Sequence, residues 1–397
     1  MSRVLYIQYT NPGGYPPLQH SSRILAEAGW KVLFLGTGAF GADSLEFPVH
    51  PNITVKRMAF RVPGWRQKLH YFAFCVWSLW TALVWRPSLV YASDPFSCPI
   101  AWILTWIPGL RVFYHEHDSP SAAAGCHWFQ SFIFRTRCWL ARRADFCILP
   151  NEVRLERFKA ELGPVRNAVC VWNCPALREA LKERRSDATT PIWLLYHGSI
   201  VPERLPPAVI GALALLPDSV RLRVVGYETI GSHGYVAALR RQAEALGIGN
   251  RVEFLAPISR EELMKATQMS DIGLALLPAS SADQNFQSMP GASNKAFDYL
   301  ACGLPVIVSD LHDWHEMFVA PGYGLACNPG DPTSIAAAIG WLIDHPDQMR
   351  QMGESGRRKI LSEWNYESVF QPVMQYLSNP DSVGKSAVKD SRFQDAR

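Results

Sequence analysis

The sequence predicts an α/β protein with two Rossmann-like domains that face each other across a cleft. Short apolar runs alternate with helical stretches along most of the 397 residues, an order typical of βαβ units and parallel sheets. A turn rich in glycine follows the first apolar run, at the edge where such sheets bind ligands. A second series of strands and helices starts near residue 191. The predicted domains are 1–174 and 175–364, followed by a helix at 365–377 that returns to the first domain and a disordered tail at 378–397.

Composition restricts the class of protein. The chain is 48% hydrophobic and 19% charged, and its formal net charge of +4 is too small for a dedicated nucleic-acid binder. Nine cysteines without a Cys-x-x-Cys pair indicate reduced thiols. The N-terminal residues MSRVLYIQYT lead directly into a strand, so no signal peptide is expected. These features favour a cytoplasmic protein.

The first βαβ unit spans residues 3–35. A strand at 3–9 is followed by the turn Thr10–Gly14, a helix at 18–28 and a strand at 31–35. Gly13 and Gly14 leave room for a diphosphate or an acceptor to approach the backbone, although an ordinary tight turn would use the same residues. A literal G-x-G-x-x-G occurs at 36–41, but it follows the second strand and opens no helix, so we reject it as a dinucleotide fingerprint.

The helix predicted at 69–85 is unusually apolar. Its 17 residues contain no Lys, Arg, Asp or Glu, which reaches the lower limit for a membrane span. However, residues 89–92 read as the next strand of the same sheet, and a span would place this strand across the bilayer. We therefore expect a crossover helix that lays surplus aromatic side chains into a membrane interface. Complete burial between layers is the alternative.

A second segment combines aromatic and basic residues. Residues 126–143 interleave five aromatic side chains with Arg135, Arg137, Arg142 and Arg143. Such helices can bind single-stranded nucleic acid or anionic lipid headgroups, and the neighbouring apolar helices favour lipid. A solvated basic face with a buried aromatic face is the alternative.

The remaining strands of the first domain are predicted at 53–60, 89–92, 111–114, 146–149 and 168–172, with another apolar helix at 98–107. The strand at 111–114 leads into His115 and His117, which alternate and therefore share a face. No further ligands are spaced convincingly nearby, so a metal site is not expected. A structural histidine is the alternative for His117.

The segment Gly291–Asp310 organises the second domain. It reads as a helix that the Ser293 hydroxyl caps, a stop at Gly303 and a buried strand. Lys295 and Asp298 stand three residues apart near the helix N-terminus, which is a natural anion site. Phosphates at Lys295 and ribose hydroxyls at Asp298 would suit a nucleotide. A capped surface helix with an incidental ion pair is the alternative.

The segment SNKAFDYLACGLPVIVS resembles the donor-nucleotide motif of retaining family 4 glycosyltransferases, which have the two-domain GT-B fold. That family usually carries two glutamates eight positions apart; here Asp298 stands at the later position and Pro290 at the earlier one. The family also has an arginine and a lysine for the diphosphate, and here Ser199 and Arg204 stand in their places. The resemblance implies donor binding by Gly13, Gly14, Gly198, Ser199, Arg204, Pro257, Ile258, Ser293, Asn294, Lys295 and Asp298, and contact of His117 with the reacting sugar.

The resemblance implies transfer of a sugar from a nucleotide-diphosphate donor to a hydroxyl acceptor, with retention of anomeric configuration. No Asp-x-Asp motif occurs, so neither a divalent metal nor another cofactor is expected. The expected partners are a nucleotide sugar, a lipid-linked or saccharide acceptor and the anionic inner face of a membrane. Nucleic acid is not expected as a partner. Two alternatives remain: a sugar-nucleotide 2-epimerase with the same architecture, and a non-catalytic membrane scaffold.

Overall fold

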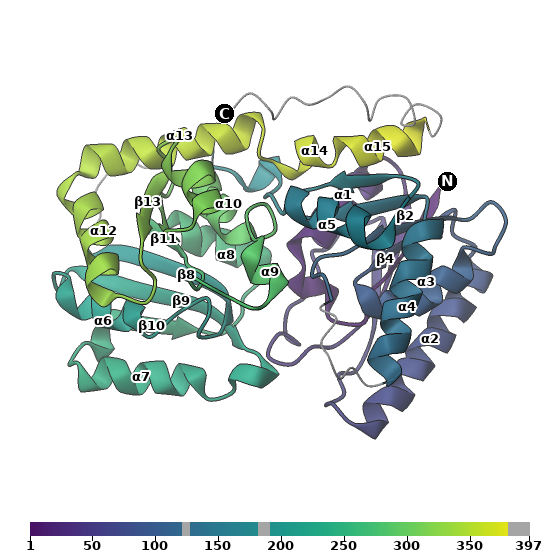
Figure 1. The fold of residues 1–397 in the computed structure, drawn as a ribbon, viewed down its shortest axis with the longest axis horizontal. Coiled ribbons are helices and arrows are strands. Elements are labelled where there is room, and N and C mark those ends of the chain that lie inside the picture. The colour runs from purple at the N-terminus through teal and green to yellow at the C-terminus, as the bar shows by residue number, and fades with distance from the viewer. Residues whose placement is uncertain (121–127, 182–190, 380–397) are drawn as a thin grey trace.

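The computed structural model describes residues 1–120, 128–181 and 191–379, and it shows two α/β domains side by side (Figure 1). The predicted fold class is therefore confirmed. Within these residues, no helix combines the length and hydropathy that crossing a bilayer requires.

The first domain is built on a parallel sheet that has seven strands within the described residues. The strand order β3-β2-β1-β4-β5-β6-β7 reverses between β1 and β4. Ligands of doubly wound sheets bind beyond the carboxyl ends of the strands at such a switch point. The strands are β1 (Arg3–Ile7), β2 (Lys31–Thr37), β3 (Ile53–Met58), β4 (Leu89–Ser93), β5 (Arg111–His115), β6 (Phe146–Leu149) and β7 (Ala168–Cys170).

Helices cover both faces of this sheet because successive strand side chains point to opposite sides. Leu5 and Ile7 pack into one buried cluster, and Val4 and Tyr6 pack into the other. Helices α2 to α5 contribute to the first cluster and α1 to the second. Their bounds are α1 (Pro16–Glu27), α2 (Trp65–Trp85), α3 (Cys98–Leu104), α4 (Trp128–Arg143) and α5 (Glu152–Leu162).

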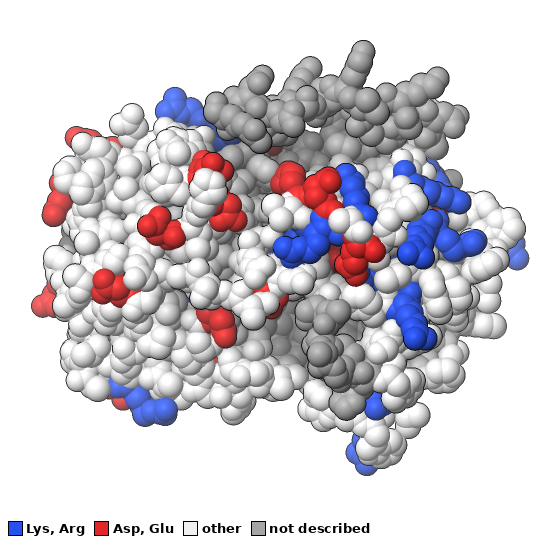
Figure 2. All heavy atoms as spheres, in the orientation of Figure 1, with Lys and Arg blue, Asp and Glu red and all other residues white. Residues whose placement is uncertain are grey.

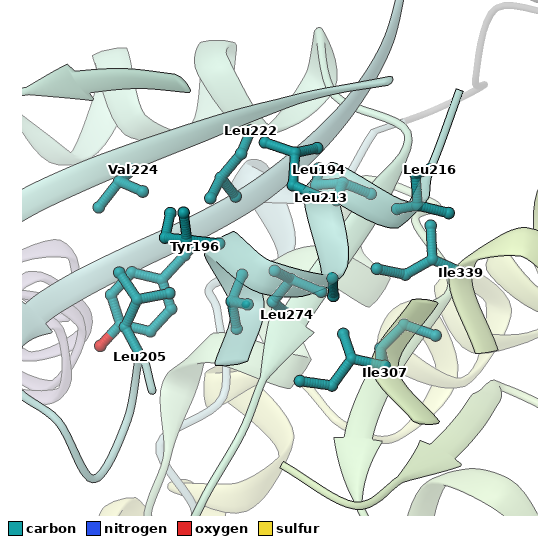
Figure 3. Packing of buried hydrophobic residues seen from close by; sticks show 14 of the residues in the cluster. Leu194, Tyr196, Leu205, Leu213, Leu216, Leu222, Val224, Leu274, Ile307 and Ile339 are labelled. Carbon is teal, nitrogen blue, oxygen red and sulfur yellow. The ribbon is translucent and has the colours of Figure 1, made fainter. Parts of the chain in front are cut away.

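The second domain repeats the plan with a parallel sheet in the order β10-β9-β8-β11-β12-β13. Figure 3 shows one of its cores, in which Leu194 and Leu222 from neighbouring strands meet Ile339 from a covering helix. The strands are β8 (Ile192–Ile200), β9 (Val220–Glu228), β10 (Val252–Leu255), β11 (Ile272–Ala275), β12 (Val306–Ser309) and β13 (Gly324–Cys327). The helices are α6 (Ala208–Leu215), α7 (Tyr235–Ala245), α8 (Arg260–Gln268), α9 (Gln284–Gln287), α10 (Asn294–Ala301), α11 (His312–Trp314), α12 (Pro332–Asp344) and α13 (Pro346–Ser362).

The end of the described chain packs against the first domain. After α13, the short helices α14 (Tyr366–Val369) and α15 (Gln371–Ser378) run over the first domain in Figure 1. Phe370 and Val373 are fully buried in the same cluster as Val4 and Tyr6. The disordered tail predicted at 378–397 lies outside the described residues from 380 onward.

Some predicted boundaries differ from the observed ones. Helix α2 begins at Trp65 rather than residue 69, directly after Gly64 with its φ of 146°. Helix α3 ends at Leu104 rather than 107, and the Thr105 hydroxyl donates to the Trp102 carbonyl at 2.7 Å. No helix follows β2 within residues 38–50, which agrees with the rejection of the G-x-G-x-x-G match.

Candidate active site

Two adjoining hollows lie in the cleft between the domains. The larger encloses about 200 Å³ and the smaller about 140 Å³. Gly14, Pro16, Arg204, Asn294 and Lys295 line both of them. The loop after β1 therefore faces the N-terminus of α10 and the loop after β8, as expected when two such sheets present their carboxyl ends to one cleft.

The hollows bring together most of the predicted site. The larger one is lined by Gly13, Gly14, Gly198, Ser199, Arg204, Pro257, Ile258, Asn294 and Lys295. The smaller one adds His117 and Ser293. Pro257 and Ile258 line only the larger hollow and His117 only the smaller one, whereas the cations Arg204 and Lys295 line both. This arrangement has the order of a nucleotide sugar: base, phosphates, sugar.

Lys295 is a buried cation that lines both hollows, with 7% of its surface exposed. Burial, and then the charge of Arg204, lower the pKa of Lys295 to about 7. Gly198 has a φ of +109°, which favours glycine, and a Cβ atom there would lie 3.0 Å from Lys295 Nζ and push the amine aside. The surrounding protein therefore holds this amine partly neutral near pH 7, and an anion beside it would restore its charge.

Ser199 orients the second cation. Arg204 Nη1 donates to Ser199 Oγ at 3.1 Å, and the guanidinium lies 5.4 Å from the ring centre of Phe286. Its Nε is buried and has no hydrogen-bond partner among the described residues. The serine in place of the family arginine thus supports Arg204 rather than supplying a charge.

Ser293 occupies the N-cap position of α10, but its hydroxyl makes no capping hydrogen bond. The predicted side-chain cap is therefore wrong. Its φ of −91° and ψ of 122° are the extended values of an N-cap residue, and Ser293 instead lines the smaller hollow.

The prediction for Asp298 also needs correction. Its side chain is fully buried and lines neither hollow. Arg260 donates to both carboxylate oxygens at 2.6 Å, and Asn294 Nδ2 donates to one of them at 3.0 Å. Such a paired carboxylate is not presented to a ribose in this structure. Burial raises the pKa of Asp298 although Arg260 opposes the shift.

Arg260 belongs to a buried network that the sequence did not predict. Besides Asp298, it pairs with Glu179 at 2.9 Å, and Glu179 lies 3.0 Å from His20 of α1. Arg260 and His20 hold the pKa of Glu179 well below its ordinary value despite its burial. Because Arg260 lines the larger hollow, the network joins both domains directly behind the site.

His117 lies at the opposite end, on the first domain. Its backbone nitrogen donates to Asp94 Oδ1 at 3.2 Å, and its carbonyl accepts from Arg154 Nη1 at 2.7 Å. Burial, and then the charge of Arg154, lower the pKa of His117 to about 3. The imidazole is therefore neutral at physiological pH and can hydrogen-bond a sugar hydroxyl without adding a charge.

Residues of the first domain bind the loop that contains Pro290, where the family has its earlier glutamate. Arg154 donates to the carbonyls of Ser288 and Asn285 at 2.9 and 2.8 Å, and Asn151 donates to the carbonyl of Pro290. Asn285 and Ser119 exchange two hydrogen bonds of 2.8 and 3.0 Å. This loop therefore serves as a contact between the domains.

The rings of His115 and His117 lie 4.0 Å apart, and His115 Nδ1 is 2.8 Å from the Tyr91 hydroxyl. No group of three or more potential metal ligands is found among the described residues.

Comparisons with known proteins agree with this geometry. Residues 178–359 match the family model for glycosyl transferases group 1, and residues 17–189 match the model for a glycosyl transferase 4-like domain. The chain is 25% identical over 408 residues to a glycogen synthase of Mycobacterium tuberculosis, with 92% of each chain covered.

A GDP-mannose-dependent alpha-(1-6)-phosphatidylinositol monomannoside mannosyltransferase of Mycolicibacterium smegmatis is 26% identical over 206 residues, which cover 51% of this chain and 52% of that one. The structure of Anabaena Alr3699/HepE in complex with UDP and glucose superposes with a TM-score of 0.71 at 18% identity, covering 95% of this chain and all of that one. Together with the two facing sheets and the cleft between them, these matches show that the chain belongs to the group 1, family 4-type glycosyltransferases of GT-B fold.

Proposed function

We propose that this glycosyltransferase takes a hexose from a nucleotide-diphosphate donor bound across the two hollows, with the diphosphate between Arg204 and Lys295. The position of these two cations, where the hollows meet, is the observation that carries the proposal. The departing diphosphate gains negative charge in the transition state, and fixed cations with low exposure stabilise that charge. The base would lie beside Pro257 and Ile258, and the sugar beside His117.

The reaction would retain anomeric configuration and would need no divalent metal, as the family assignment and the absence of an Asp-x-Asp motif suggest. Transfer assays with and without a chelator such as EDTA test the second point. Unchanged rates are expected, and a chelator-dependent loss restored by Mg²⁺ or Mn²⁺ would contradict it.

The direct test of the donor site is Lys295→Ala. A hydrogen bond to a charged group contributes roughly 1.5–3 kcal/mol, so kcat/KM for the donor should fall at least tenfold. Lys265→Ala, which removes an exposed lysine on α8, is the matched control. Wild-type kinetics in folded Lys295→Ala protein would refute the assignment.

The acceptor is proposed to be lipid-linked, and the first domain is proposed to dock on the cytoplasmic face of a membrane. One face of α2 supports this, because its large apolar side chains are at least half exposed and recur every three or four residues: Trp65, Leu69, Phe72, Val76, Trp80 and Leu83. The opposite face, with Tyr71, Phe74, Ser78 and Ala82, is buried on the sheet. The mannosyltransferase relative named above acts on a phosphatidylinositol mannoside, as its name states.

Basic residues border this face. Figure 2 shows Lys and Arg gathered over the first domain, whereas acidic residues predominate over the second. Arg66 and Lys68 lie 5.4 and 6.0 Å from the ring centres of Trp65 and Trp128. Aromatic side chains paired with cations suit the headgroup region of an anionic membrane.

The predicted basic set needs one correction. Arg135 and Arg142 are exposed, but Arg137 is only 1% exposed and pairs with the buried Glu116 and with Glu161. It therefore anchors α4 to the sheet and is unavailable to lipid. Removing it would leave Glu116 as an unpaired buried charge.

Flotation with anionic liposomes tests the docking. Phe72→Ser with Trp80→Ser should abolish flotation, and Arg135→Gln with Arg142→Gln should weaken it at low salt by about 1 kcal/mol per charge. Leu215→Ser removes an equally exposed side chain from α6 of the second domain and should have no effect. Wild-type protein that stays unbound at low salt would contradict the proposal.

A further inference from the structure

Asp94 has a backbone conformation that L-residues rarely adopt. It directly follows β4, and its φ of 64° and ψ of 163° fall in a region that is essentially confined to glycine. Among the described residues other than glycine, only Arg86 also has a positive φ. Arg86, however, has the ordinary left-handed conformation at the end of α2.

Hydrogen bonds on every side hold Asp94 in this conformation. Its backbone nitrogen donates to the His115 carbonyl at 3.0 Å, and its carbonyl accepts from the Ser97 nitrogen at 3.0 Å and the Ser97 hydroxyl at 2.6 Å. Its Oδ2 accepts from Gln8 Nε2 at 3.3 Å. The carboxylate thus lies across the carboxyl ends of β1 and β5, the two strands that flank β4.

The remaining carboxylate oxygen holds His117. Asp94 Oδ1 accepts the His117 backbone N–H at 3.2 Å, while Arg154 holds the His117 carbonyl. The ring itself has a buried Nε2 without a hydrogen-bond partner among the described residues, and its centre lies 5.4 Å from that of the tilted Tyr15 ring. His117 is therefore fixed through its backbone, which leaves its ring available to the smaller hollow.

A purely structural turn would be served better by glycine, which adopts this conformation without strain. The side chain carries a second cost, because burial and the nearby Asp118 raise the pKa of Asp94 to about 7. A strained and buried carboxyl group at the switch point of the sheet is typical of a site where strain serves function.

We propose that Asp94 is a positioning residue for sugar transfer, whose strained backbone holds its carboxylate against the His117 main chain and so fixes the imidazole at the sugar end of the cleft. This inference rests on the role proposed above for His117. It predicts that relieving the strain makes the protein more stable and less active.

Two substitutions of Asp94 separate strain from hydrogen bonding. Asp94→Gly removes both, so the Tm should rise by about 2–4 °C, and kcat should fall at least tenfold with the donor KM unchanged. Asp94→Asn keeps an oxygen for the His117 N–H. Its new Nδ2 can donate to Gln8 Oε1, which has no partner among the described residues, once the Gln8 amide flips. This variant should retain kcat within about threefold, since both hydrogen bonds are kept.

Arg86→Gly is the matched control. It relieves the other positive φ outside glycine, so it should raise the Tm similarly and leave kcat unchanged. Assays at pH 8, with whichever of UDP-glucose and GDP-mannose the wild type binds, keep the Asp94 carboxyl ionised. Imidazole resonances of ¹⁵N-histidine-labelled protein report on His117 without any acceptor. They should be single and sharp in the wild type and in Asp94→Asn, and broadened or doubled in Asp94→Gly.

Three results would overturn the inference. Wild-type kcat and a sharp His117 signal in Asp94→Gly would show that positioning is not needed, and a lowered Tm would show that Asp94 is only a structural anchor. Equal losses of kcat in Asp94→Asn and Asp94→Gly would assign the effect to charge. Failure of the wild type to bind either nucleotide sugar in calorimetry would instead contradict the proposed donor site, and the imidazole resonances and Tm values would still decide the role of Asp94.

Discussion

The Lys295 amine should take up a proton when the donor binds. The pKa of Lys295 is about 7, lowered by burial and by Arg204. A diphosphate beside the amine favours its charged form, so the pKa of Lys295 should return toward 10.5 in the complex. Binding is then strongest where the free protein already carries the charge, at or below pH 7, and weakens as the pH rises.

The size of the effect follows from this shift. At pH 8, one unit above the pKa, about one-tenth of the free protein is charged at Lys295, so binding should take up about 0.9 proton. The donor affinity should fall about tenfold per pH unit between pH 7.5 and 9, which corresponds to about 1.4 kcal/mol per unit. Below pH 7 the affinity should level off.

The lowered pKa of Lys295 has the opposite effect on the stability of the ligand-free protein, which should increase with pH. Between pH 7 and 10.5 the unfolded chain binds more protons at this position than the folded chain, so the free energy of unfolding should rise with pH. Lys295→Met should remove this contribution and raise the Tm at pH 7.

Isothermal titration calorimetry in buffers with different ionisation enthalpies measures the proton uptake. A nucleotide sugar is the ligand of choice because its diphosphate does not titrate between pH 7 and 9. Lys295→Met should abolish both the uptake and the pH dependence, and Lys265→Gln should change neither. Wild-type binding that is independent of pH in this range, with no proton uptake, would refute the reasoning.

Three further predictions concern His117 and the buried network around Arg260. His117→Ala should leave the affinity for the nucleoside diphosphate nearly unchanged and lower sugar transfer, because His117 lies at the sugar end; calorimetry that showed equal losses of affinity and activity would contradict this division. Arg260→Ala should lower the free energy of unfolding by roughly 3–5 kcal/mol in denaturant titrations, since two buried carboxylates lose their partner. Asp298→Asn should likewise affect stability more than donor affinity, and a large loss of affinity at unchanged stability would restore its predicted ribose contact.

Much of the architecture could be predicted because it depends on local patterns. Buried parallel strands such as Leu89–Ser93 read as continuous apolar runs, and Gly303 with Pro305 marks the step from helix to strand in the donor motif. The hollows contain the predicted glycines and cations because the loops after parallel strands meet at one edge of each sheet.

What the sequence could not provide were partners distant along the chain. No pattern in the sequence pointed to Arg260, and its partner Glu179 is 81 residues away. Asp298 was therefore expected to hold ribose hydroxyls rather than to pair with Arg260. Nothing in the sequence marked the backbone conformation of Asp94, because a non-glycine residue with positive φ has no pattern of its own.

The burial of Arg137, in contrast, could have been predicted from the sequence. It shares a helical face with Ile133, Leu140 and Ala141, which are all buried. Arg135 lies on another face and is exposed. Helical spacing within the segment, rather than its basic composition, separates the arginine that packs from those that can meet a membrane.

The central claim is that this cleft moves a sugar from a nucleotide-diphosphate donor to an acceptor hydroxyl. The most direct test is to incubate wild type and Lys295→Ala with a panel of nucleotide sugars and lipid-linked acceptors in anionic liposomes. Mass spectrometry then follows the formation of glycolipid and the release of nucleoside diphosphate. The account predicts acceptor-dependent release of nucleoside diphosphate with equimolar glycolipid, reduced at least tenfold in Lys295→Ala. Epimerised donor formed without acceptor, or tight donor binding with no transfer to any acceptor, would contradict it.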